Sequence, residues 1–167
     1  MEPYRITVVC LGNICRSPIG EAVLRERILA AGLADRVAVD SAGTGDWHIG
    51  HPADPRSRET LLAAGYPGWD HQARQITPNW FAAIDLALAM DEANYADLER
   101  LISRSGQETE LRMMRSFDPV LAHLAEPSAG LDVPDPYFGG PEGFVEVLAM
   151  VERAADGLLA ELPARLA

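Results

Sequence analysis

The sequence predicts a single α/β domain over residues 1–167, in which a central four-stranded, parallel, twisted sheet carries helices on both faces. The first observation is that short runs rich in Val, Ile and Leu alternate with longer segments of helical apolar spacing, an order typical of parallel sheets. The second is the length of 167 residues, which suits one core of ordinary size. The third is a short Gly-Asn loop that joins the first expected strand directly to the first expected helix.

Each element is expected where its residues favour it. Strands are predicted where β-branched and apolar residues cluster between turn residues, over 5–11, 36–44, 83–90 and 110–117. Helices are predicted over 17–32, 54–65, 91–103 and 141–166. Ser17 is expected to cap the first helix, with Pro18 at its first helical position and Gly32 at its end, and Gly65 closes the second helix.

The segments that follow the strands are candidates for a binding site. In open parallel sheets, ligands bind beyond the carboxyl ends of the strands, which here places four segments together: 10–17, 43–55, 91–94 and 118–141. The last of these is a long, Pro- and Gly-rich loop, and such loops in small domains usually serve function.

Composition limits the classes of partner and compartment. The formal net charge is −11, and all fourteen basic residues are arginine, so we expect no nucleic-acid partner and no anionic membrane partner. Arginine without lysine indicates the codon bias of a GC-rich, bacterial genome. No apolar stretch approaches the roughly 20 residues of a membrane span, and no signal peptide is visible. We expect a cytoplasmic protein that is a monomer by default, and export without a signal peptide is the alternative.

Both cysteines of the chain lie in "CLGNICRSP", residues 10–18. Cys-x4-Cys is not a common zinc spacing, so no metal is expected. A structural disulfide does not suit a reducing cytoplasm. Two buried, inert thiols would be the ordinary alternative.

The residues between the cysteines favour a phosphate-binding loop. Gly12 and Asn13 tolerate positive φ, and a loop running into a helix N-terminus can aim successive backbone N–H groups at an anion. Arg16 adds a planar fork that matches two phosphate oxygens. These donors would also stabilise a thiolate at Cys10, to which Ser17 can donate its hydroxyl. The rest of the loop is Leu11, Ile14 and Cys15.

These motifs resemble a known family. "VCLGNICRSP", "DSAGTGDWHIGHPADPR", "DHQARQIT", "MDEANYADL" and "VPDPY" are similar, in this order, to the low-molecular-weight protein tyrosine phosphatases. The resemblance implies phosphotyrosine hydrolysis through a cysteinyl-phosphate, without a cofactor. It implies Cys10 as nucleophile, Arg16 as phosphate clamp and Asp135 as general acid and base. Phosphotyrosine proteins or peptides would be the substrates, and inorganic phosphate the product.

The same resemblance implies the surroundings of the site. Trp47 and Tyr137 would form the walls of a slot for the phenyl ring, with Phe138 where the family often has a second tyrosine. Asn13, Ser41 and His71 would support the loop, with Ser41 and His71 hydrogen-bonded to the Asn13 side chain. Asp91 would orient His71. Cys15 would form a protective disulfide with Cys10 under oxidation.

Three alternatives compete with this interpretation. Arsenate reduction on a related fold would need further relay cysteines or an external thiol. A non-catalytic phosphotyrosine-binding module would lack the nucleophile or the acid. A nucleotide-binding domain would carry G-x-G-x-x-G or G-x-x-x-x-G-K-[ST], and the sequence contains neither.

Overall fold

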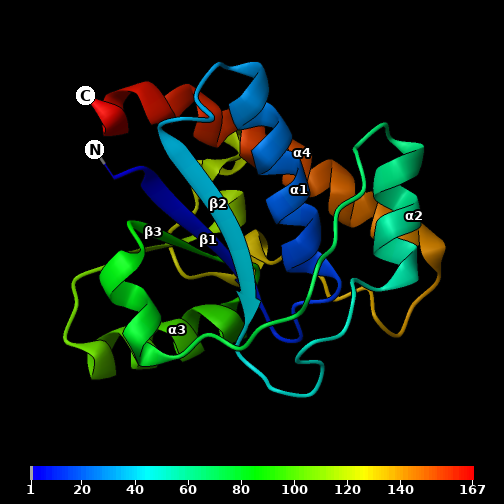
Figure 1. Ribbon diagram of the computed structural model, residues 1–167, viewed down its shortest axis with the longest axis horizontal. Helices are drawn as coiled ribbons and strands as arrows, with labels where there is room; N and C mark the ends of the chain where they lie inside the picture. Colours follow the sequence, from blue (N-terminus) through cyan, green and yellow to red (C-terminus); the bar gives the residue numbers. More distant parts are fainter. Residues whose placement is uncertain (1) are drawn as a thin grey trace.

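The structure is a computed structural model that describes residues 2–167. Four parallel strands form one sheet in the order β2-β1-β3-β4 (Figure 1). The strands are β1 (Tyr4–Cys10), β2 (Val37–Gly43), β3 (Leu86–Ala89) and β4 (Glu110–Met113). The predicted parallel, four-stranded sheet is therefore confirmed.

Helices cover both faces of this sheet. They are α1 (Arg16–Ala30), α2 (Pro55–Ala63), α3 (Glu92–Ser105) and α4 (Pro141–Leu166). On one face α1 packs against β1 and β2 and against α4, which also contacts α2, whereas α3 packs against β3 and β4 on the other face. Within residues 2–167, no helix combines the length and the apolar character that crossing a bilayer requires.

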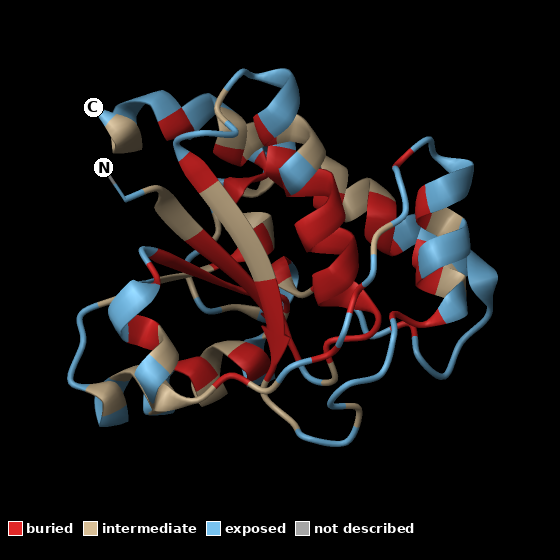
Figure 2. Cartoon of the chain, viewed as in Figure 1, coloured by how far each residue is buried: buried red, intermediate tan, exposed pale blue. Residues whose placement is uncertain are grey.

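Alternating side chains divide the core between the two faces. From β1, Ile6 and Val8 join the larger apolar cluster with α1 and α4. Val9, from the same strand, joins Ala87 and Ala89 of β3 in the smaller cluster with α3. The buried centre of the sheet lies between these clusters (Figure 2). The period of two in a strand explains this division, and it makes β1 a rigid support for Cys10 at its carboxyl end.

Two predicted strands are shorter than expected. The strand expected over 83–90 is restricted to Leu86–Ala89, because the 3₁₀ helix η1 (Pro78–Ala83) reaches position 83. The strand expected over 110–117 ends at Met113, because Met114–Phe117 form a 3₁₀ turn, η2, that packs against α4. Met114 and Phe117 are buried although they lie in a turn, so their apolar character resembled that of a buried strand in the sequence.

Candidate active site

The carboxyl ends of the strands meet at a pocket of about 210 Å³. Its lining contains the predicted nucleophile, phosphate clamp and acid, together with both predicted aromatic walls and most of the loop. The lining residues are Cys10, Leu11, Gly12, Ile14, Cys15, Arg16, Trp47, His48, Asp135, Tyr137 and Phe138. Segments far apart in the chain thus converge on one cavity. His48 was not predicted to line it, and its position next to Trp47 in the loop after β2 was the available signal.

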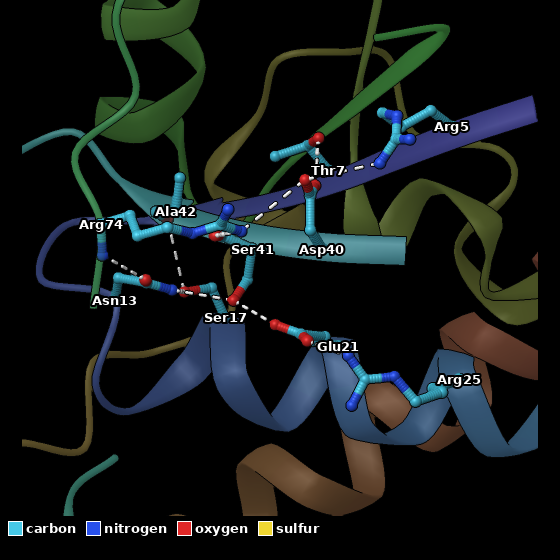
Figure 3. A network of polar contacts seen from close by, with 10 residues as sticks. All are labelled: Arg5, Thr7, Asn13, Ser17, Glu21, Arg25, Asp40, Ser41, Ala42 and Arg74. Carbon is cyan, nitrogen blue, oxygen red and sulfur yellow. Dashed lines mark hydrogen bonds and ion pairs between the residues drawn. The ribbon is translucent and has the colours of Figure 1, made fainter. Parts of the chain in front are cut away.

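Asn13 fixes the shape of the loop between β1 and α1. It has a φ of 57°, the left-handed conformation that was expected, and its side chain is fully buried. Its Nδ2 donates to Ser17 Oγ at 2.8 Å and to Ser41 Oγ at 2.9 Å, and its Oδ1 accepts from the Arg74 backbone N–H at 2.9 Å (Figure 3). Ser41 Oγ in turn donates to Glu21 Oε1 at 2.6 Å. These contacts offset the cost of left-handed backbone at a residue other than glycine.

His71 supports the loop in a way that differs from the prediction. Its Nε2 lies 2.7 Å from the backbone oxygen of Asn13 and does not bind the Asn13 side chain. Burial lowers the pKa of His71, although its hydrogen bond to Asn13 acts in the opposite direction. The ring is therefore held neutral beneath the loop.

Cys10 lies at the foot of the pocket and is almost fully buried. Ser17 Oγ is 3.0 Å from Cys10 Sγ. This oxygen accepts from Asn13 Nδ2, so its single proton can be donated either to the sulfur or to the carbonyl oxygen of Ala42, which is farther away at 3.5 Å. This geometry lets Ser17 stabilise a thiolate.

The predicted role of Ser17 as a helix cap was wrong. The first helical residue of α1 is Arg16, two positions before the expected Pro18, and no side chain caps its first turn. Pro18 consequently occupies the third helical position and not the first. The Ser17 hydroxyl is engaged by Asn13 and Cys10, so the N–H groups of the first turn remain available to an anion in the pocket.

Arg16 is buried and held along one edge. Its Nη1 donates to Asp91 Oδ2 at 2.6 Å and to the carbonyl oxygen of Val133 at 3.0 Å. Burial alone would lower the pKa of this guanidinium, but the charge of Cys10 and the hydrogen bond to Asp91 raise it. A permanent positive charge therefore lies beside the sulfur.

Asp91 does not orient His71, and that prediction was wrong. Its Oδ2 binds Arg16, and its Oδ1 accepts from the Asn94 backbone N–H at 2.8 Å, which caps α3. Asp91 is separated from the end of β3 only by Met90, so its carboxylate reaches the start of α1 across the carboxyl ends of neighbouring strands. His71 instead reaches the loop from the segment before η1.

Asp135 lies at the mouth of the pocket. Its Oδ2 is 3.7 Å from Arg16 Nη2, and its side chain is 43% exposed. Its Oδ1 accepts from the Tyr137 backbone N–H at 3.1 Å. A partly solvated carboxylate in this position can exchange a proton with a bound group and with water.

Aromatic side chains rise from the two loops that border the mouth. Trp47 and Tyr137 line the pocket, and Phe138 packs edge-on against Tyr137 with a centroid distance of 4.9 Å. His48 lies 6.2 Å from Tyr137, centroid to centroid. Trp47 folds back over Gly45, where an added Cβ would lie 1.9 Å from the indole. The result is an apolar slot above a polar floor.

Cys15 and Cys10 are both free thiols and both are buried. Cys15 Sγ donates to Asp54 Oδ2 at 3.8 Å. Burial and the neighbouring charge of Asp54 raise the pKa of Cys15 to about 12. The two thiols thus differ in surroundings, since Cys15 faces a carboxylate and Cys10 faces Arg16. Within residues 2–167, no three His, Cys, Asp or Glu side chains converge as a metal site would require.

A thiol beside a buried arginine, under a carboxylate and below an aromatic slot, is a chemical arrangement for transferring a phosphoryl group from an aryl ester to sulfur and then to water. The class that the fold and the site define is therefore that of cysteine-dependent phosphatases. The model of the family "Low molecular weight phosphotyrosine protein phosphatase" matches residues 5–166. The chain belongs to this family, as the sequence motifs predicted.

Individual relatives agree over almost the whole length. A low molecular weight protein-tyrosine-phosphatase of Streptomyces coelicolor is 50% identical over 157 residues, which are 94% of this chain and 92% of that protein. The low molecular weight protein-tyrosine phosphatase A of Mycobacterium tuberculosis is 45% identical, with coverage of 99% and 96%. A crystal structure of a protein tyrosine phosphatase from Entamoeba histolytica, with Hepes in its active site, has a TM-score of 0.83 at 33% identity, with coverage of 97% and 98%.

Proposed function

We propose that Cys10, Arg16 and Asp135 carry out the phosphotyrosine hydrolysis that defines the family. The observation that supports this most is their meeting in one pocket, with Arg16 Nη2 lying 3.7 Å from Asp135 Oδ2. Substrates are phosphotyrosine-containing proteins or peptides, and the products are the free tyrosine and inorganic phosphate. No metal or cofactor takes part in this proposal.

In the first step, the Cys10 thiolate attacks phosphorus and forms a sulfur–phosphorus bond, while the bond from phosphorus to the tyrosine oxygen breaks. Asp135, protonated at this stage, gives its proton to the departing phenolate. Arg16 and the N–H groups at the start of α1 bind the equatorial oxygens, where charge accumulates in the transition state. Leu11, Gly12, Asn13, Ile14 and Cys15 supply the backbone of this cradle.

In the second step, water attacks the phosphorus of the cysteinyl-phosphate and the sulfur leaves as thiolate. Asp135, now a carboxylate, accepts a proton from that water and is restored for the next cycle. The hydroxyl of Ser17, 3.0 Å from the sulfur, stabilises the departing thiolate. Inorganic phosphate then dissociates.

The slot formed by Trp47 and Tyr137 selects the substrate by depth. Cys10 lies below the aromatic rim, so a phosphoryl group must be carried on a long, flat side chain to reach it. Phosphoserine is shorter and would leave its phosphorus above the sulfur. The tilted aromatic rings can pack on a phenyl ring, which adds binding energy for tyrosine.

The remaining expectations concern the setting of the enzyme. We propose a single functional domain over 1–167 that acts as a cytoplasmic monomer, where reducing conditions keep Cys10 a thiol. Under oxidation, we propose that Cys15 forms a disulfide with Cys10. Size-exclusion chromatography with light scattering tests the monomer, and a peroxide-treated sample mapped for disulfides tests the pairing.

Asp135→Asn tests the assignment of the acid. With aryl phosphates of increasing leaving-group pKa, we expect kcat/KM of Asp135→Asn, which reports the first step, to fall steeply, by roughly 10²–10⁴-fold for phenyl phosphate. For leaving groups that depart without a proton, the loss should be small. Cys10→Ser should abolish turnover and retain phosphate binding. Equal slowing of Asp135→Asn across the series would remove Asp135 as the acid.

A further inference from the structure

We infer that Arg56 is a positioning residue for the reaction, because it fastens the loop that carries Asp135 to the loop that carries Cys10. Neither the sequence motifs nor the proposed mechanism gives Arg56 a role. The inference rests on the proposed role of Asp135 as general acid. It concerns the chain segment 135–139, here called the acid loop.

Arg56 is connected to the loop between β1 and α1 through Asp54, which makes two hydrogen bonds to that loop. The Asp54 backbone N–H donates to the carbonyl oxygen of Ile14 at 2.8 Å. Its Oδ2 accepts from Cys15 Sγ at 3.8 Å. Asp54 is also the N-cap of α2, where its Oδ1 accepts from the Arg56 backbone N–H at 2.9 Å. Asp54 therefore cannot move independently of the phosphate loop.

Arg56 continues from Asp54 to the acid loop. Its Nε and Nη2 donate to the two carboxylate oxygens of Asp54 at 3.1 and 3.0 Å. Its Nη2 also donates to the carbonyl oxygen of Tyr137 at 2.9 Å, and its Nη1 to that of Gly139 at 3.1 Å. One planar guanidinium thus binds a carboxylate on one edge and two backbone carbonyls on another.

The backbone of Tyr137 connects Arg56 to the carboxylate of Asp135. The carbonyl of Tyr137 is bound by Arg56, and its N–H donates to Asp135 Oδ1 at 3.1 Å. On the N-terminal side of Asp135, the carbonyl oxygen of Val133 accepts from Arg16. The N–H of Val133 donates to the carbonyl oxygen of Met90 at 2.7 Å. Asp135 therefore lies between two anchors, and Arg56 supplies the one on the C-terminal side.

Aromatic packing holds the guanidinium itself in place. Its Cζ lies 4.5 Å from the centroid of Phe144, whose ring is fully buried on α4, and 5.7 Å from that of Tyr137. A flat, delocalised cation can stack in this way and still use its edges for hydrogen bonds, which a lysine ammonium cannot do. We expect Arg56→Lys to behave more like Arg56→Met than like the unmodified protein.

The experiment compares Arg56→Met and Arg56→Lys with Arg58→Met, an exposed arginine on the same helix. Each variant is assayed with phenyl phosphate and with aryl phosphates whose leaving groups depart without a proton. A misplaced acid costs up to about 100-fold, so we expect kcat/KM, which reports the first step, to fall at least tenfold in both Arg56 variants for phenyl phosphate and little for the activated esters. Arg58→Met should leave both rates unchanged.

A double-variant cycle separates positioning from general damage to the fold. In an Asp135→Asn background the acid is already lost, so Arg56→Met should cause no further fall in kcat/KM for phenyl phosphate. The inference is overturned if the loss is the same for all leaving groups, or if it adds in full to that of Asp135→Asn. If Arg56→Met fails to fold, Arg56→Lys, which retains the charge of α2, serves in the same cycle.

The two proposals fail in different ways. If Asp135→Asn slows only the poor leaving groups and Arg56→Met does not, Asp135 remains the acid and the positioning role of Arg56 is wrong. If Asp135→Asn leaves phenyl phosphate hydrolysis intact, the assignment of the acid itself is wrong, and the role of Arg56 falls with it.

Discussion

Arg16 Nη1 and Asp91 Oδ2 lie 2.6 Å apart, across the carboxyl ends of β1 and β3. The same Nη1 also donates to the carbonyl of Val133, so this edge of the guanidinium is occupied by the protein. The fork that remains faces the pocket, where Arg16 Nη2 is 3.7 Å from Asp135. Asp91 thereby decides how Arg16 is presented to a phosphoryl group.

Asp91→Asn tests this presentation. Asparagine is also a good helix N-cap, so α3 should remain intact and the melting temperature should change little. With the amide oxygen retained as the cap, the NH2 group that replaces Oδ2 cannot accept from Arg16, so this hydrogen bond is lost, and a difference of roughly 1.4 kcal/mol corresponds to about a tenfold fall in kcat. Inhibition by inorganic phosphate should not weaken, because the neutral amide competes less for the guanidinium. An unchanged kcat would show that Asp91 does not orient Arg16.

Ser17→Ala should change which step limits turnover. Without the hydroxyl 3.0 Å from Cys10 Sγ, the thiolate is a poorer leaving group, so hydrolysis of the cysteinyl-phosphate should slow by roughly 10-fold or more. Stopped-flow measurements with para-nitrophenyl phosphate should then show a burst of about one phenolate per enzyme. Ser57→Ala is the matched control, because this buried hydroxyl donates to the Cys15 carbonyl and not to the sulfur. A Ser17→Ala variant without a burst contradicts the role.

His71 makes the fold sensitive to acid. Burial lowers its pKa in the folded state relative to the ordinary value of 6.5, so the unfolded chain binds the proton more readily. The free energy of unfolding should therefore fall as the pH drops below about 6.5, and level off once the folded state is protonated as well. Urea unfolding at a series of pH values measures this. In His71→Gln the same pH interval should have a smaller effect, and an equal effect in both proteins would argue against His71 as the source.

Gly157 is required by the packing of α4 on η2. A Cβ at this position would lie 1.8 Å from the carbonyl oxygen of Phe117. We expect Gly157→Ala to destabilise the protein by about 1–3 kcal/mol, despite the higher helix propensity of alanine. Gly143→Ala is the control on the same helix, since its Cβ would meet Pro136 at an ordinary 3.4 Å. Denaturant midpoints that are equal for the two variants would contradict this packing.

Gly45→Ala should disturb the slot without disturbing the fold. The new Cβ would lie 1.9 Å from the Trp47 ring, and this exposed ring can swing away at little cost in stability. An aromatic contact contributes about 0.5–1.5 kcal/mol to binding. Its loss corresponds to a rise in KM for aryl phosphates of roughly 2- to 12-fold. The melting temperature should be close to that of the unmodified protein. A KM that stays constant would remove Trp47 from substrate binding.

Local rules were sufficient for the central strand β1 and for the conformation of Asn13 in the loop that follows it. Val8 and Val9 lie in an unbroken apolar run because β1 is buried on both faces, which is the pattern that predicts a central parallel strand. Asn13 could be assigned a left-handed conformation because few other residues tolerate it. In both cases the residue type itself indicates the local conformation, so the prediction did not need the distant partners that stabilise it.

The predictions were wrong or incomplete where contacts with residues elsewhere in the fold determine a residue's structure or role. Asp91 binds Arg16, 75 positions away, and no periodicity in the sequence carries that information. Ser17 has the chemistry of a helix cap, but Asn13 and Cys10 engage its hydroxyl first. Met114 has the apolar character of a strand residue, and only its packing beneath α4 makes it part of a turn. Arg56 was missed for the same reason, since its contacts on the acid loop lie more than 80 positions away.

The buried hydrogen bonds of Asn13 also determine whether the phosphate-binding loop loses its conformational entropy during folding or on ligand binding. With both ends of its amide bonded and its carbonyl held by His71, the loop is ordered as the chain folds and not when phosphate arrives. Preorganisation of this kind lets binding energy act on the transition state. The backbone of the loop should therefore have the same conformation with and without bound phosphate.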